Sequence, residues 1–259
     1  MSIFFRKTSK RSYKMSITKR QQQILELLRE NTFLSVEQLS KLTYISPSSV
    51  RRDLTKLQST SLIRRTHGGA EIIGSTDKPA PLPNRMTKNV AGKKKIAKKA
   101  VQLIRDGMSV MLDGSSTAGF LIPYIARFKE ITLFTNNMIT ATTAINYGIN
   151  THCIGGQSVR GSAVLSGTAA YEAVKRIHTD ILFFSSQCID ENGIISDSTE
   201  EENYLRSLML KSAEMTVFLC DSEKFCLRSL HTLSDIDNID VAIFDSPFKN
   251  LKETRCKLL

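Results

Sequence analysis

The chain has 259 residues, of which 41% are hydrophobic and 24% are charged, as is typical of a globular protein with one large domain or with one small and one medium-sized domain. No apolar run approaches the ~20 residues that a membrane-spanning helix needs, and residues 1–20 lack the apolar stretch of a signal peptide. We therefore expect a cytoplasmic protein with no membrane partner. The five cysteines form no C-x-x-C pair, which argues against a zinc site or a disulfide framework, so we expect reduced thiols, no metal and no cofactor.

The net charge of +11 is concentrated near the N-terminus. Residues 1–70 hold 14 Lys+Arg and 4 Asp+Glu, which leaves 22 and 21 for residues 71–259. Such a concentration favours a polyanionic partner over a merely solvated basic surface. Residues 1–17 have no helical or strand period, so we expect a disordered basic extension. It could contact DNA phosphates, or it could have no function if Met15 is the natural translation start.

Two helices are predicted at the start of a domain spanning residues 18–73. The first should begin after Thr18, a good capping residue, and end near Asn31. The second should begin after Ser35, because Gln38 three residues later completes a capping-box pattern. We expect the buried stripe of this second helix to be Val36, Leu39 and Leu42.

A third helix, predicted over residues 47–58, has the pattern of a DNA-recognition helix. One side is apolar, with Val50, Leu54 and Leu57. The candidate DNA contacts lie on the opposite side and its flanks: Ser48, Ser49, Arg51, Arg52, Thr55 and Lys56. Arginine can pair bidentately with guanine, and hydroxyls at a helix start can contact phosphates or bases. For this helix alone, an ordinary amphipathic helix with a solvated basic face would be the better explanation.

The segment LIRRTHGGAEII at residues 62–73 predicts two short strands around a His-Gly-Gly turn. Three helices followed by such a hairpin indicate a winged helix-turn-helix. This wing adds Arg64, Arg65 and His67 as candidate DNA contacts. A structural role in the turn is the more common one for a histidine such as His67.

The segments RQQQILELL (20–28), SSVRRDLTKL (48–57) and RTHGGA (65–70), in this order, resemble the DNA-binding domain of the DeoR family of bacterial repressors. The resemblance covers essentially all of residues 18–73. Gln58 and Ser61 depart from it, because the family usually has an acidic residue and a glycine just after the recognition helix. Neither change touches the proposed DNA-reading face.

Residues 74–86, rich in proline and without an apolar period, predict a linker to a second domain over residues 87–259. Short apolar runs alternate there with helical stretches, which predicts a Rossmann-like, mainly parallel α/β fold. The runs are residues 109–112, 131–134, 152–154, 181–184, 216–219 and 241–244.

Small polar segments follow several of these runs, where ligands bind on parallel sheets. They begin at Asp113, Thr135, Gly155 and Asp221. Hydroxyls at a helix start suit a phosphate, because free N–H groups and the helix dipole face it. Ordinary turn chemistry explains each segment singly, whereas four at one edge favour a polar-ligand site.

The resemblance to the DeoR family continues through KKKIAKKAVQLIRDG (93–107), DGSST (113–117), TNN (135–137) and DSEKF (221–225), and it implies a sensor domain for phosphorylated sugars. It assigns the phosphate to Ser115, Ser116 and Thr117. It assigns the binding of sugar hydroxyls to Asp113 and Glu202, and it assigns the binding of the anion or of a ring oxygen to Lys224. The candidate effector site is completed by Asn136, Gly155 and Gly156. The chain departs from the family's sequence pattern at two places. One is the segment Ser185–Asp190, and the other is Arg206, a position at which lysine is usual in the family.

The resulting expectation is a repressor of a carbohydrate-metabolism operon that binds double-stranded operator DNA as a dimer or tetramer and responds to a phosphorylated sugar. A sugar-phosphate isomerase-like enzyme with an appended DNA-binding domain is the first alternative, with Glu202 or Asp113 as acid or base. The second alternative is a non-specific architectural DNA protein. Of the three, only the enzyme requires catalytic residues, and we expect none.

Overall fold

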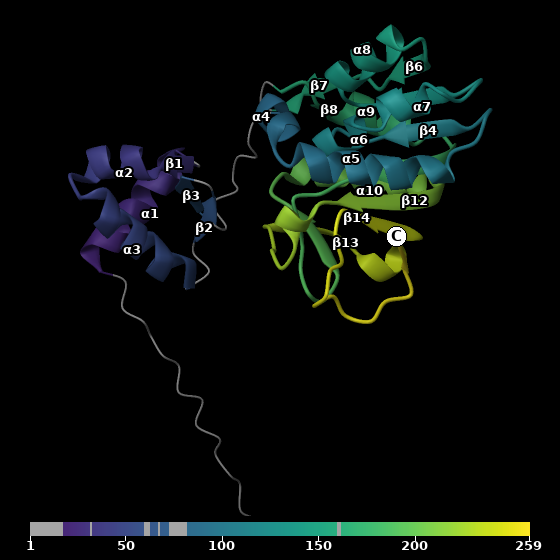
Figure 1. The fold of residues 1–259 in the computed structure, drawn as a ribbon. Coiled ribbons are helices and arrows are strands. Elements are labelled where there is room, and N and C mark those ends of the chain that lie inside the picture. The colour runs from purple at the N-terminus through teal and green to yellow at the C-terminus, as the bar shows by residue number, and fades with distance from the viewer. Residues whose placement is uncertain (1–17, 32, 60–62, 67, 73–81, 160–161) are drawn as a thin grey trace, which may run out of the picture. The chain divides into compact units, whose positions relative to one another are not determined.

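The computed structural model describes residues 18–31, 33–59, 63–66, 68–72, 82–159 and 162–259 (Figure 1). The chain divides into two compact units, Met1–Ser75 and Thr76–Leu259. The predicted basic extension, residues 1–17, lies outside the described residues, as do residues 74–81 of the predicted linker.

The described part of the first unit contains helices and a small antiparallel sheet, in the order α1 (Lys19–Asn31), β1 (Phe33–Ser35), α2 (Val36–Thr43), α3 (Pro47–Ser59), β2 (Ile63–Thr66) and β3 (Gly69–Ile72). Strands β2 and β3 form the hairpin of the wing, with Ile63 opposite Ile72 and Thr66 opposite Gly69. The predicted winged helix-turn-helix is confirmed. Strand β1 was not predicted, and it pairs with β3 to give the sheet order β1-β3-β2.

Local hydrogen bonds explain where the helices begin. The Ser35 hydroxyl accepts from the Gln38 backbone N–H, and the Gln38 side chain accepts from the Ser35 backbone N–H, so the predicted capping box is present. Thr18 and Gln21 exchange the same pair of bonds at the start of α1.

The predicted buried stripe of α2 is wrong at one position. Leu42 is 48% exposed, whereas Thr43 is buried beside Val36 and Leu39. At ~100° per residue, Thr43 lies within about 20° of Val36 around the helix axis, and Leu42 lies about 120° away. The position around the helix axis therefore determines which residue is buried here, even though leucine is more apolar than threonine.

The second unit is built on a seven-stranded sheet in the order β15-β14-β12-β9-β4-β5-β6, in which every neighbouring pair is parallel. Its strands are β4 (Ser109–Leu112), β5 (Thr132–Thr135), β6 (Asn150–Cys153), β9 (Thr179–Phe184), β12 (Ala213–Cys220), β14 (Val241–Phe244) and β15 (Lys257–Leu258). The six apolar runs correspond to six of these strands, and the predicted parallel α/β fold is confirmed. Strand β15 was not predicted.

Helices cover both faces of the sheet (Figure 1). They are α4 (Leu82–Thr87), α5 (Val90–Ala100), α6 (Ser116–Gly119), α7 (Ile122–Ile125), α8 (Met138–Asn146), α9 (Thr168–Val174) and α10 (Glu200–Lys211). Alternate residues of β9 supply two separate cores: Phe183 packs with α5 and α7, and Leu182 and Phe184 pack with α9 and α10. Helix α4 occupies the end of the predicted linker, so residues 82–87 are helical.

Two small antiparallel sheets complete the second unit. One has the order β10 (Cys188–Ile189), β11 (Ile194–Asp197) and β13 (His231–Asp235), and the other pairs β7 (Gln157–Ser158) with β8 (Leu165–Ser166). Strand β4 lies centrally in the large sheet: the chain continues to β5 and β6 on one side and then returns to β9 on the other. Such a reversal opens a crevice at the carboxyl ends of β4 and β9, where ligands bind in this class of fold.

Candidate DNA-binding and effector sites

The exposed side of α3 carries the predicted DNA-reading residues. Val50, Leu54 and Leu57 are at most 1% exposed and pack in the core of the first unit. The six candidates on the other side are exposed or, for Ser49, partly exposed: Ser48, Ser49, Arg51, Arg52, Thr55 and Lys56.

Asp53 attaches α3 to α1 from the buried side. Its carboxylate accepts from Arg20 Nε at 2.5 Å and from Arg20 Nη2 at 2.9 Å, and Gln21 adds a third bond at 3.3 Å. A bidentate pair of this kind fixes orientation as well as distance. The angle at which α3 presents its basic side is therefore held by a carboxylate that the sequence analysis had not singled out.

The wing and the recognition helix meet through two of the predicted residues. Arg65 Nη1 donates to Thr55 Oγ1 at 2.9 Å, and that hydroxyl donates to the Arg51 carbonyl oxygen at 2.9 Å. Arg51 also lies 4.0 Å from Glu37 on α2. These residues form one connected surface rather than independent contacts. The Arg64 side chain and His67 lie outside what the structure describes.

In the second unit, the carboxyl edge of the sheet brings together Asp113, Asn136, Ser185 and Lys224, which follow β4, β5, β9 and β12. Asp113 is 1% exposed and accepts two backbone N–H bonds, from Ser115 at 3.1 Å and from Ser185 at 3.3 Å. Lys224 Nζ donates to Ser185 Oγ at 2.8 Å. A continuous polar path thus joins the loops after β4, β9 and β12.

Arg206 on α10 is the centre of this site. Its Nε lies 2.9 Å from Asp113 Oδ2, and its Nη1 lies 3.3 Å from Asp197 Oδ2. Its Nη2 is 3.7 Å from Glu202 Oε2, and the Arg206 side chain is only 5% exposed. Burial lowers the pKa of this guanidinium, but the three carboxylates outweigh burial and hold the pKa above its ordinary value. Burial also raises the pKa of Glu202, and the Arg206 charge opposes that shift.

The loop predicted to bind phosphate has a mixed set of partners. The Ser115 hydroxyl accepts from the Ala118 backbone N–H and caps α6, so it has a structural task. Thr117 Oγ1 is buried without a hydrogen-bond partner, and so is Asn136 Oδ1 across the crevice. Buried oxygens left unpaired are costly, and they commonly mark a place where a ligand or water binds.

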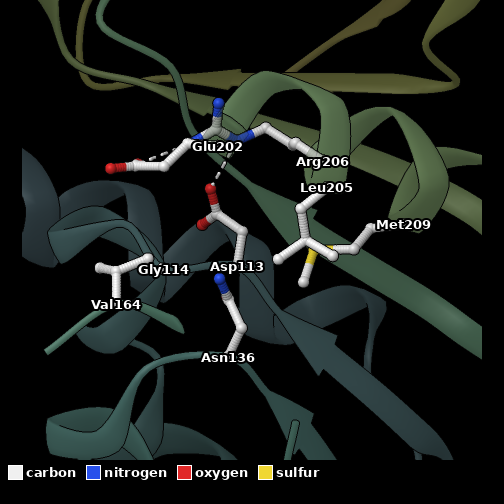
Figure 2. Close-up of a pocket in the computed structure, with 8 residues that line it drawn as sticks. All are labelled: Asp113, Gly114, Asn136, Val164, Glu202, Leu205, Arg206 and Met209. Atoms are coloured by element: carbon white, nitrogen blue, oxygen red, sulfur yellow. Dashed lines mark hydrogen bonds and ion pairs between the residues drawn. The ribbon is translucent and has the colours of Figure 1, made fainter. Parts of the chain in front are cut away.

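The cavity among these groups is lined by Asp113, Gly114, Asn136, Val164, Glu202, Leu205, Arg206 and Met209 (Figure 2). Asp113 reaches from the end of β4 toward the Arg206 guanidinium, and Asn136 lies on the other side of Asp113 (Figure 2). The free volume is about 10 Å³, close to the minimum for a single water molecule. The Arg206 side chain therefore fills the space that faces the two predicted sugar-binding carboxylates.

Gly155 and Gly156 are exposed and follow β6. A Cβ on Gly156 would lie 2.4 Å from the Ser166 carbonyl oxygen, and its φ of +139° is one that side chains rarely adopt. This glycine thus permits close packing of backbone against β8. Neither glycine is among the residues that line the described cavity.

Sequence reasoning missed Asp197, Ser185 and Ser186 as members of the site. Ser186 Oγ bonds to the Ser196 carbonyl at 2.7 Å and lies 3.4 Å from Asp197 Oδ2. Both serines follow β9, so the rule that points to loops after strands could have found them. Asp197 ends a strand of the small antiparallel sheet, where that rule gives no signal.

Both units match known family models. Residues 20–76 match the DeoR-like helix-turn-helix domain, and residues 88–246 match the DeoR C terminal sensor domain. The chain belongs to the DeoR family. Its members in this comparison include the HTH-type transcriptional regulator GolR of Listeria innocua, 30% identical over 88% of this chain and 90% of that protein. The L-fucose operon activator of Haemophilus influenzae is 30% identical over 92% and 96%. The transcriptional repressor AccR of Agrobacterium fabrum is 28% identical over 91% and 92%.

DeoR-family membership establishes a DNA-binding transcriptional regulator with a sensor domain. Its two parts correspond to the two units of the chain. Among the helices that the structure describes, none is both long and apolar enough to cross a membrane.

Proposed function

We propose that this DeoR-family protein represses a carbohydrate-metabolism operon by binding operator DNA through α3 and the wing, and that a phosphorylated sugar bound at the sheet edge alters this binding. One observation carries the sensor part of the proposal. Asp113 and Glu202 both contact Arg206, and Lys224 bonds to Ser185, whose backbone N–H donates to Asp113. Thr117 Oγ1 and Asn136 Oδ1, in the loops after β4 and β5, are buried without hydrogen-bond partners. The names of relatives add support for control of a sugar operon: one is the L-fucose operon activator of Haemophilus influenzae, and another is a putative aga operon transcriptional repressor of Escherichia coli.

The chemistry of the site suits such a ligand. An ammonium at Lys224 and backbone N–H groups of the loop after β4 would bind a phosphate. Carboxylates at Asp113 and Glu202 would accept from sugar hydroxyls. Both carboxylates now contact Arg206, so a sugar must either share them with the guanidinium or displace it.

Displacement offers a mechanism for signalling. A cavity of about 10 Å³ is far smaller than a sugar phosphate, so binding requires that α10 or the Arg206 side chain move. A ligand shifts a conformational equilibrium by its differential affinity for the two states. If the site must open before the effector can bind, the effector binds the open state more tightly than the closed state and shifts the equilibrium toward it.

The effector part of the proposal is tested with full-length protein, a panel of aldose and ketose phosphates and the matching unphosphorylated sugars. We expect one phosphate to raise the thermal unfolding midpoint and to change the affinity for DNA, without chemical turnover. Turnover of that sugar phosphate would favour the isomerase-like alternative instead.

Lys224→Ala localises the effect. We expect this variant to bind DNA as the wild type does and to lose the response to the sugar phosphate. Lys129→Ala, at an exposed position outside the site, is the matched control and should respond normally. An unchanged response of Lys224→Ala at the same effector concentration would show that the site assignment is wrong.

The DNA part is tested with an operator selected from random duplexes. Arg52→Ala should reduce discrimination between this operator and random DNA by about 5–150-fold, the value of one bidentate base contact. Lys56→Ala should weaken binding to both DNAs alike if it contacts phosphate. If Arg52→Ala discriminates between operator and random DNA as well as the wild type does, Arg52 is not one of the residues that contact the bases.

A further inference from the structure

One stretch of the sensor unit differs from the rest of the chain in charge. Residues 131–159 contain no Asp, Glu, Lys or Arg, although these types make up 24% of the whole chain. The stretch forms β5, α8 and β6, which lie together at one end of the seven-stranded sheet (Figure 1). An uncharged segment of this length is expected in a protein core, but much of this one lies at the surface.

Helix α8 exposes apolar side chains where a surface helix normally carries charge. Ile145 is 60% exposed and Tyr147, directly after the helix, is 51% exposed; Met138 and Ile139 at its start are also exposed. Thr142 and Thr143 donate their hydroxyls to backbone carbonyls of the same helix, at 2.8 Å and 2.7 Å. Even the polar residues of this face are therefore partly satisfied within the helix.

Strand β6 beside it is an edge strand. Within the described residues it pairs with β5 on one side, and it is the last strand in the sheet order. The Ile154 N–H donates to the Thr135 carbonyl. Because backbone groups alternate in direction along a strand, those of Thr151 and Cys153 point away from the sheet. Edge strands are commonly protected by charged residues or proline, and β6 has neither.

We propose that α8 and β6 form the contact surface between two copies of this chain. A twofold axis beside β6 would set the two β6 strands antiparallel, so that the outward groups of Thr151 and Cys153 pair with those of the second copy and the sheet continues across the interface. The exposed apolar residues of the two α8 helices would then cover each other.

The absence of charge on this surface indicates that its partner is a second copy of the chain. In a twofold interface the same patch meets itself, so any net charge on it opposes itself. Nearly all of the +11 charge lies in residues 1–70, so two sensor units do not strongly repel each other, and a face without charged residues meets its own copy with no like-charge contacts. The same lack of cations argues against DNA as the partner of this face.

The test is the molar mass of the full chain in solution at micromolar concentration, by sedimentation equilibrium. Ile145→Glu places a charge in the proposed contact without creating a core cavity, because Ile145 is largely exposed. We expect it to halve the mass of the wild-type assembly. Leu230→Glu, at a position 72% exposed outside this face, is the control and should keep the wild-type mass.

A second variant addresses the strand alone. Thr151→Pro removes an outward N–H and no bond to β5, since proline is tolerated on the free side of an edge strand. It should weaken self-association at least tenfold while the thermal unfolding midpoint of the separated chain stays near that of Ile145→Glu. A monomeric wild type, or an Ile145→Glu variant that keeps the wild-type mass, would overturn the proposal.

Discussion

The Arg206 Nε atom lies 2.9 Å from Asp113 Oδ2, and this contact joins helix α10 to the loop after β4 across 93 residues of sequence. Asp197 and Glu202 share the same guanidinium, so one buried cation faces three buried or nearly buried carboxylates. One guanidinium offsets only part of the charge of three carboxylates, and each buried ion carries a desolvation cost of several kcal/mol, so the group depends strongly on its single cation. Stability and effector response should therefore depend on the same residue.

Arg206→Met should destabilise the sensor unit by about 3–5 kcal/mol, because it leaves the three carboxylates without a counter-charge. Urea unfolding of the full chain, followed by circular dichroism, measures the change in free energy. Arg206→Lys keeps the positive charge and should lower the free energy of unfolding by less. Arg228→Met, which removes the exposed partner of an ion pair with Asp190, is the control and should change the free energy of unfolding by less than about 1 kcal/mol. Equal stability of Arg206→Met and wild type would contradict the view that the guanidinium balances these acids.

In the first unit, Asp53→Asn should loosen the junction of α1 and α3. Asparagine keeps one acceptor but loses the charge-assisted bidentate pair with Arg20, and we expect a loss of about 1–3 kcal/mol. Hydrogen exchange of the α3 amides in the full chain reports this unit separately from the sensor. Glu37→Gln affects only an exposed contact of 4.0 Å with Arg51 and serves as the control. Unchanged exchange in α3 after Asp53→Asn would mean that apolar packing alone orients the helix.

Tyr44, in the turn between α2 and α3, is 96% exposed and has φ of 55°. A left-handed backbone costs a bulky residue about 1 kcal/mol, and asparagine tolerates it better. Tyr44→Asn should therefore stabilise the first unit by up to ~1 kcal/mol, seen as slower exchange of the amides of α2 and α3. Tyr204→Asn, at a tyrosine of α10 that is 49% exposed and whose φ is not positive, should give no such gain. Faster exchange in the Tyr44 variant would reveal that the tyrosine ring stabilises the turn.

Periodicity and turn chemistry predict most of the elements because they depend on local interactions. Ser35 and Gln38 cap α2 as their spacing implies, and the six apolar runs lie in strands of the parallel sheet. Strand β1 follows from no local pattern, since its three residues are held by pairing with β3 far along the chain. The wrong prediction for Leu42 also follows from local geometry. The angular position of a residue around the helix axis decides whether it is buried, and the type of residue matters less.

The candidate effector site could be predicted only in part. Asp113, Asn136 and Lys224 follow strands of the large sheet, so the rule for parallel sheets places them at one edge. That Arg206 would occupy the space between Asp113 and Glu202 depends on how α10 packs across the edge, which no local pattern encodes. Likewise, the bond between Arg65 and Thr55 depends on the fold of the wing onto α3.

Lys93 provides a pH-dependent test of the segment that enters the sensor unit. This lysine is buried, and its ammonium donates to the carbonyl oxygens of Arg85 and Lys88, the second at 2.7 Å, around the end of α4. Burial, with a smaller contribution from the charge of Lys224, lowers the pKa of Lys93 to about 8, and the carboxylate of Asp221 opposes this shift.

Because the pKa of Lys93 is about 8 in the folded protein and ~10.4 in the unfolded chain, the unfolded chain binds the proton more tightly between these values. Folding stability from this group therefore rises as the pH increases from about 8 toward 10, and below that range the buried charge is a constant cost. Lys93→Met has no such dependence. Urea unfolding of both proteins at about pH 7 and about pH 9.5 should show the wild type gaining stability relative to the variant at the higher pH, since the other titrating groups are common to both. If the wild type gains no stability relative to the variant at the higher pH, Lys93 keeps an ordinary pKa in the fold and its ammonium is not held in a desolvated site beside α4.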